Sequence, residues 1–271
     1  VAIKSKFEMG LFEIVSLHKT VEFRGTEFTE TEEGLVVSQS KYLSSKLKSC
    51  AVDSNPKTFL SNFRGSLGTA RWVVDLSQYV ELYDISKAAQ KVNCLTEPDA
   101  KILNDSISLM KSGPLTVLLP KLSKLYPPKL VGIADAGMAD RDVWVNGQLG
   151  FAIGVANDAP ATEKQPKILK AFAAVEVKSQ KLRRVANGSF DAETLAGVRC
   201  VTALLIGQLL IKEFYHGVSP TLASRVETLA SEGLDSLDEN LEEDALRGLC
   251  QIELHTDSDG LVRHVNSQLA N

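Results

Sequence analysis

The sequence predicts an α/β protein: a mixed sheet with flanking helices forms the second half, preceded by a smaller α+β domain. Apolar runs of strand length indicate the sheet, and a long apolar segment with helical spacing indicates a helix that covers it. The hydrophobic content of 44% is enough for a buried core. In chain order, the second half is expected to hold strands at 130–136, 147–155 and 173–177, a helix at 190–214 and a fourth strand at 251–256.

The first half is expected to hold a hairpin, several helices and one strand. Asn55-Pro56 is typical of a break between helices, and Ser112-Gly113-Pro114 of a helix end. The proline-rich linker 122–128 predicts a domain boundary, which divides the chain into 1–127 and 128–271. The expected elements are strands 21–23 and 35–37 around a polar turn region 29–34, a helix 40–49, a helical region 63–92, a helix 97–110 and a strand 115–119.

Two further segments complete the second half. The acidic stretch 227–247 is compatible with a helix that faces solvent, and 261–269 is expected to form a closing helix. The longest apolar run, 201–211, is shorter than the roughly 20 residues that cross a bilayer, so no membrane-spanning segment is expected.

Cysteine usage and charge limit the possible function classes. The 4 cysteines are far apart and form no Cys-x-x-Cys pair, which favours reduced thiols in an intracellular, reducing compartment over structural zinc or disulfides. The net charge of −4 is unfavourable for a protein that binds nucleic acid through Lys and Arg.

Three carboxylates stand out because of their positions along the chain. Asp135 lies in an apolar strand, Glu193 opens the long apolar helix and Asp257 ends the last strand. Two divalent cations about 3.5–4 Å apart need oxygen ligands from several elements, and Mg²⁺ prefers carboxylates, phosphates and water. Each acid also has a plain structural explanation: a turn or edge position for Asp135, a favourable helix dipole for Glu193 and a helix cap for Asp257.

Other polar residues near these acids are weaker candidates. Lys178, Lys181, Arg183 and Arg184 precede the apolar helix and either contact a nucleic-acid backbone or form a solvated charge run. His255 shares a strand face with Asp257, although an ordinary packed or exposed histidine is the simpler interpretation.

Several short motifs carry a resemblance to a known family. In the second half they are 129–136 (KLVGIADA), 147–150 (GQLG), 178–185 (KSQKLRRV), 192–196 (AETLA) and 256–258 (TDS). In order and spacing they resemble the end of the Pol polyprotein of copia-type LTR retrotransposons, where the ribonuclease H domain follows the tail of the reverse transcriptase. Looser matches at 23–27, 33–35, 42–43, 63–68 and 84–86 are similar to the polymerase thumb and connection.

The resemblance implies a ribonuclease H-like domain after a thumb- or connection-like domain. It implies hydrolysis of the RNA strand of an RNA/DNA hybrid with Mg²⁺ or Mn²⁺, where Asp135 bridges both ions and Glu193 and Asp257 complete their ligands.

The chain also departs from the family pattern. Ala134 replaces the usual Ser, 77–82 replaces an expected turn, and the paired aspartates of the polymerase are missing, so no polymerase activity is expected. The printed sequence reaches Asn271 before the family's fourth carboxylate, so either the chain continues or the site has three acids. The alternative function is an inert, co-opted relic that serves as a structural subunit and binds protein partners in a larger assembly.

Overall fold

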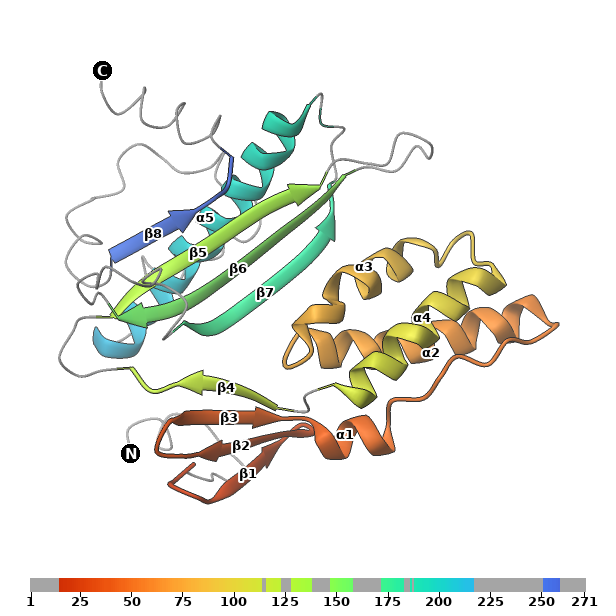
Figure 1. Ribbon diagram of the computed structural model, residues 1–271, viewed down its shortest axis with the longest axis horizontal. Helices are drawn as coiled ribbons and strands as arrows, with labels where there is room; N and C mark the ends of the chain where they lie inside the picture. Colours follow the sequence, from red (N-terminus) through yellow and green to blue (C-terminus); the bar gives the residue numbers. More distant parts are fainter. Residues whose placement is uncertain are drawn as a thin grey trace.

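The structure is a computed structural model that describes residues 15–113, 116–122, 128–137, 147–157, 172–182, 186, 188–216 and 251–258. Within these residues the protein is a mixed α/β structure with an antiparallel four-stranded sheet and a mixed four-stranded sheet. Figure 1 shows the smaller sheet below the mixed sheet and a group of helices to one side. The predicted combination of a mixed sheet with helices and a smaller α+β part is therefore confirmed at this level.

The smaller sheet contains one strand more than the sequence predicted. Its strands pair antiparallel in the order β1-β2-β3-β4, which joins the hairpin strands to a strand that follows the helices. The predicted turn region 29–34 was too long, because its ends belong to the strands 26–30 and 34–38. A second, unpredicted reversal at Arg24 and Gly25, whose φ angles are 50° and 79°, creates the additional strand. The strands are β1 (Thr20–Phe23), β2 (Thr26–Glu30), β3 (Gly34–Ser38) and β4 (Thr116–Pro120).

The helices between β3 and β4 pack around their own apolar core. The side chain of Asn55 accepts hydrogen bonds from the backbone N–H groups at the start of α2, and Thr96 forms a capping box at the start of α4. Phe63, Ile85 and Ile107 are fully buried in this core. The helices are α1 (Ser40–Ser45), α2 (Pro56–Val74), α3 (Leu82–Gln90) and α4 (Glu97–Ser112), with a 3₁₀ turn η1 (Tyr79–Glu81) between α2 and α3.

The mixed sheet has the strand order β7-β6-β5-β8. β5 pairs antiparallel with β6, β6 pairs antiparallel with β7, and β8 lies parallel to β5 at the edge. The strands are β5 (Pro128–Gly137), β6 (Gln148–Asn157), β7 (Ala173–Lys181) and β8 (Gln251–His255).

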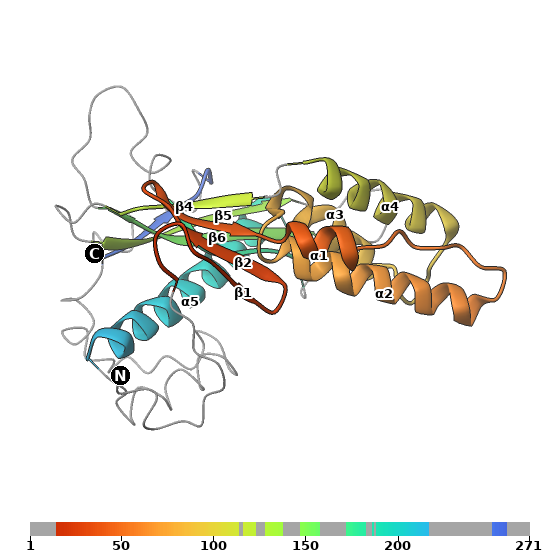
Figure 2. The same ribbon diagram turned by 90° about the horizontal axis from the view of Figure 1, so that it is seen from below.

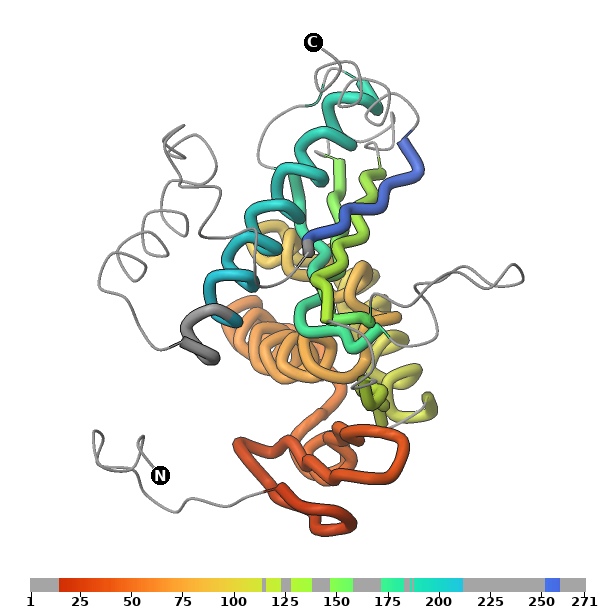
Figure 3. Tube along the Cα trace, turned by 90° about the vertical axis from the view of Figure 1, so that its left-hand side faces the viewer, coloured from red at the N-terminus to blue at the C-terminus, as the bar shows by residue number. Residues whose placement is uncertain are grey.

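The long helix α5 (Ser189–His216) covers one face of the mixed sheet, as Figures 2 and 3 show. Ala192, Ala196, Cys200 and Leu204 recur every fourth residue and are fully buried against the sheet. The segment Ser189–Ile211 of α5 is long and apolar enough to cross a membrane by length and composition, and 39% of its apolar 18-residue window is buried. This is a weak indication, since the core helix of a soluble protein has the same properties.

The helical group and the mixed sheet meet at a polar junction. The side-chain amide of Gln148 donates to the hydroxyls of Ser86 on α3 (2.7 Å) and Ser179 on β7 (2.8 Å), and accepts from Gln90 (3.1 Å). Val177 on β7 packs against the core of the helical group. The predicted boundary at residue 127 and the predicted helices in 227–247 and 261–269 lie outside the described residues.

Candidate metal centre

Asp135 lies near the end of β5, on the side of the strand that points away from the core under α5. Leu130 and Ala134 belong to the core with α5, so the alternation of a strand turns Asp135 to the opposite face. Its side chain is exposed, and its partner across β6 is Gly150, which has no side chain to cover it.

Asp257 follows the end of β8. β8 pairs in parallel register with β5 up to Ile133 and His255, so two residues further along each chain Asp135 and Asp257 reach the same level of the sheet. An ion pair between the Lys129 ammonium and the Glu253 carboxylate crosses the same two strands and fixes this register.

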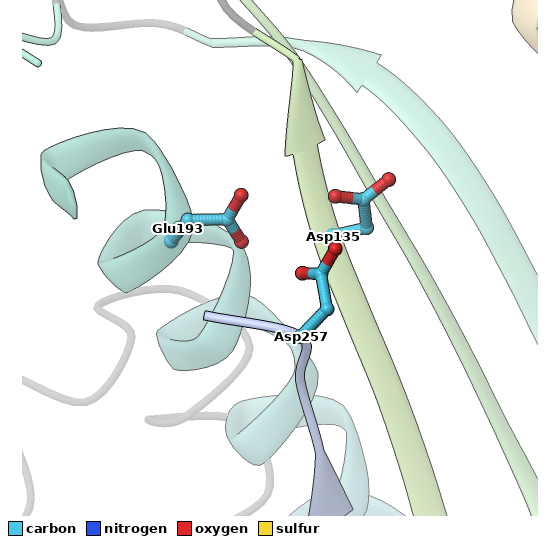
Figure 4. A group of neighbouring side chains, drawn as sticks. All are labelled: Asp135, Glu193 and Asp257. Carbon is cyan, nitrogen blue, oxygen red and sulfur yellow. The ribbon is translucent and has the colours of Figure 1, made fainter. Parts of the chain in front are cut away.

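Glu193 lies in the second turn of α5, next to the buried Ala192. Its carboxylate accepts a hydrogen bond from the backbone N–H of Ala136 on β5. This contact joins α5 to β5 at Ala136. The pairing of β5 with β8 ends earlier, at Ile133 and His255. Glu193 thereby reaches the two aspartates from the helix side, as Figure 4 shows.

The three predicted acids lie together. One carboxylate oxygen each of Asp135, Glu193 and Asp257 can be chosen so that all lie within 4.8 Å of one another. Glu193 is half-buried, and the two aspartates are exposed. The acids come from a strand, a helix and the end of a second strand, and are 58 and 64 residues apart in sequence (193 − 135 and 257 − 193).

The electrostatics of the cluster favour an added cation. Burial, followed by the charges of Asp135 and Asp257, raises the pKa of the Glu193 carboxyl, whereas the Ala136 hydrogen bond opposes this shift. The Oε2 atom of Glu193 is buried and has no hydrogen-bond partner among the described residues. A buried acceptor without a donor is unfavourable, and a bound cation would satisfy it and offset the repulsion.

The donor set fits a hard divalent cation. All of the ligand atoms are carboxylate oxygens, which suit Mg²⁺ or Mn²⁺. Two exposed aspartates leave the outer side of the cluster open to water, so a cation held there would keep open coordination positions.

The predicted basic residues do not gather at this site in the described structure. Lys178 contacts Glu176 at 3.7 Å and Asp75, just after the end of α2, at 4.0 Å, so its charge is largely matched by acids. Lys181 ends β7 and is exposed, while Arg183 and Arg184 lie outside the described residues.

The sequence did not reveal two features that support the site. The Lys129–Glu253 pair continues to His255, whose Nε2 lies 2.9 Å from Glu253 Oε1, so the face that ends at Asp257 carries a row of polar and charged side chains. The alternation of Glu253, His255 and Asp257 predicts a shared face, but the partner on β5 requires the strand register. Gly132 is the second feature, because a Cβ there would lie 2.5 Å from Sγ of Cys200 on α5.

Comparison with known proteins adds no family. No protein-family model matches this chain, and no curated protein matches it. The function of the site is therefore proposed from its geometry and chemistry, together with the resemblance of its sequence motifs.

Proposed function

We propose that this chain is a retroelement-derived, ribonuclease H-like nuclease that uses divalent metal ions to hydrolyse the RNA strand of RNA/DNA hybrids. The observation that carries the proposal is the convergence of Asp135, Glu193 and Asp257, with a buried Glu193 oxygen that lacks a donor among the described residues. The order strand, helix, strand end is the order in which ribonuclease H-like folds assemble their acids.

The sheet is consistent with this fold. Three antiparallel strands, β5 to β7, precede α5, and β8 then returns parallel to β5. This return brings an acid from late in the chain beside the first strand. The first sheet and its helices correspond to the proposed thumb- or connection-like domain.

Each acid has a distinct part in the proposed reaction. As the sequence resemblance implies, Asp135 would be a ligand of both cations, and Glu193 and Asp257 would complete their ligands. When bound, the cations would activate the attacking water and stabilise the leaving 3′ oxygen. The water oxygen forms a bond to phosphorus as the bond to the 3′ oxygen breaks, which leaves a 5′ phosphate and a 3′ hydroxyl.

A structural role in a protein assembly is the second candidate. Matched charges around Lys178 and a net charge of −4 favour it over a strong electrostatic hold on nucleic acid. Exposed apolar side chains on one side of α4, Ile102 at 51% and Leu109 at 56%, also favour a protein contact.

Cleavage of a labelled RNA/DNA hybrid in Mg²⁺ and in Mn²⁺ tests the proposal. We expect cleavage by the native chain and a loss of more than about 100-fold in Asp135→Asn, because changes even to outer-shell partners of a metal site typically cost about 10–100-fold. Asp105→Asn, the same change at an exposed site on α4, is the matched control and should cleave normally. Absence of cleavage by the native chain, with both ions, would exclude the nuclease and favour the structural role.

A further inference from the structure

We propose that Gly132 on β5 is a positioning residue for the carboxylate cluster. Because it lacks a side chain, α5 packs close enough to β5 for Glu193 to reach Asp135 and Asp257. This inference rests on the proposed function and deepens it, since it names the residue that sets the spacing of the metal ligands.

The contact at Gly132 has no room for even one methyl group. A Cβ placed on Gly132 would lie 2.5 Å from Sγ of Cys200 and 2.7 Å from Cδ1 of Leu204. Real Cβ atoms essentially never come within 3.0 Å of another heavy atom, so either the ends of these two side chains or the helix and the strand themselves would have to shift. Cys200 and Leu204 are both 0% exposed, and close packing around them leaves little space for local adjustment.

The contact of Gly132 with α5 lies at similar distances from Asp135, measured along β5, and from Glu193, measured along α5. Asp135 is 3 residues after Gly132 on the strand, and Glu193 is 7 residues before Cys200 on the helix. At about 3.3 Å per strand residue and about 1.5 Å per helix residue, both acids lie roughly 10 Å from the contact. Seven residues are nearly two helical turns, so Glu193 and Cys200 project from almost the same side of α5.

A small displacement at Gly132 is large on the scale of metal coordination. Carbon and sulfur atoms at 2.5 Å must separate by about 1 Å or more to reach ordinary contact. Metal–ligand distances are set to within about 0.2 Å, and Mg²⁺ requires nearly ideal geometry at about 2.0–2.1 Å. A methyl group at Gly132 is therefore expected to move the Glu193 carboxylate out of coordination range.

Gly207 offers a matched control on the same interface. It lies 3 residues after Leu204 on α5, and a Cβ there would be 3.6 Å from Cδ1 and 3.7 Å from Cδ2 of Leu130. These are ordinary van der Waals distances. Both glycines therefore lie between α5 and β5. A methyl group would fit at Gly207 but not at Gly132.

The test compares Mn²⁺ affinity, followed by electron paramagnetic resonance, in the native chain, Gly132→Ala, Gly207→Ala, Cys200→Ala and the double variant Gly132→Ala/Cys200→Ala. We expect Gly132→Ala to weaken Mn²⁺ binding by about 10-fold or more, in the range seen for displaced ligand supports. Gly207→Ala and Cys200→Ala should bind within about twofold of the native chain. The double variant should recover part of the affinity, because it removes the sulfur, the nearest atom that the new methyl group meets, and leaves space into which the end of the Leu204 side chain can turn.

The outcomes separate this inference from the proposed function. A native chain that binds no Mn²⁺ removes the proposed metal centre itself. Native binding with equal affinity in folded Gly132→Ala, even at a lower melting temperature, overturns the positioning role and leaves only a packing role. If Gly132→Ala does not fold, Cys200→Val crowds the same contact from the helix side, and unchanged Mn²⁺ affinity in that variant overturns the inference equally.

Discussion

Glu193 has the most constrained carboxylate of the cluster. It is half-buried, accepts one backbone hydrogen bond and faces two other acids. Asp135 and Asp257 both reach solvent, so they can keep water on the outer side of the site. The three acids together therefore store repulsion that a cation would release.

Removal of the Glu193 charge should stabilise the protein in the absence of divalent ions. The pKa of this carboxyl is raised in the folded state, so near neutral pH the folded chain must ionise a group that the unfolded chain ionises more easily. Glu193→Gln should therefore raise the free energy of unfolding at neutral pH by about 1 kcal/mol, the repulsion of two like charges 4 Å apart in water. Urea unfolding of both proteins at neutral pH, in a buffer that contains a metal chelator, measures this difference in the free energy of unfolding.

The pH dependence of that gain has a definite sign. The folded state takes up the proton first as the pH falls, so the native carboxyl becomes neutral and the advantage of Glu193→Gln shrinks toward about pH 4. Glu32→Gln, at an exposed residue between β2 and β3, serves as the control. A Glu193→Gln variant that is less stable than the native chain at neutral pH would contradict this account.

At the residue scale, the sequence indicated the acids but not what supports them. Asp135, Glu193 and Asp257 were predicted from their places in an apolar strand, at the start of an apolar helix and at the end of the last strand, and the structure brings them together. Gly132 is one of 18 glycines, and nothing in the sequence separates it from Gly207. The difference depends on which side chains of α5 lie opposite, and only the packing of the helix on the sheet determines that.

At the element scale, β8 is the most weakly attached part of the site. It has 5 residues and pairs with β5 on one side, at the edge of the described sheet. Lys129, which is 7% exposed, forms an ion pair with Glu253 across the two strands. The pair therefore helps to hold Asp257 level with Asp135.

Lys129→Met should loosen β8. Its methylene chain keeps the packing, but Glu253 loses its main partner, so we expect about 1–2 kcal/mol less stability at neutral pH. Lys129 lowers the pKa of the Glu253 carboxyl, so this stabilisation exists above the carboxyl pKa of the unfolded chain and is lost as the pH falls. Urea unfolding at neutral pH and at about pH 4 measures the change, with exposed Lys91→Met as the control. An equal loss at both pH values would contradict the ion-pair explanation.

Element types were predicted better than element limits. The long helix α5 and the strands β5, β6 and β8 match the apolar runs to within a few residues. β2 was missed, because its polar residues 26–30 (TEFTE) look like part of a turn unless the sharp reversal at Arg24 and Gly25 is recognised. β7 extends to Lys181, so part of the expected basic cluster belongs to a strand.

At the scale of the whole molecule, two apolar cores meet through polar and apolar contacts. One core lies among α1 to α4 and the other between α5 and the mixed sheet. Gln148 joins β6 to β7 and α3, and Val177 extends from β7 into the first core. The two cores are therefore expected to be coupled in stability.

Native-state hydrogen exchange tests this coupling. In the native chain, the most protected amides of α3 and of β6 should open with the same free energy, within about 0.5 kcal/mol, as parts of one cooperative unit do. Gln148→Leu leaves the hydroxyls of Ser86 and Ser179 without their amide partner and should lower the global stability by about 2 kcal/mol. Gln180→Ala, at the exposed neighbour on β7, should have little effect. Separate opening energies in the native chain would show that the two parts are independent.

Sequence reasoning could not foresee how the two halves meet. It divided the chain at residue 127 from a proline-rich linker, and that boundary stays a prediction. Gln148 carried no signal of its role, because its partners are 62 and 31 residues away and lie on different elements. Local patterns specify elements, whereas contacts of this kind depend on how the elements pack.

A crystal of the protein grown in Mn²⁺ and measured at the manganese absorption edge tests the central claim most directly. We predict an anomalous peak within about 2.0–2.3 Å of oxygens of Asp135 and of at least one of Glu193 and Asp257, and its absence in Asp135→Asn. A native crystal with no peak at these carboxylates, and with Glu193 Oε2 hydrogen-bonded to a protein donor or to water instead, would contradict the assignment of this cluster as a metal centre.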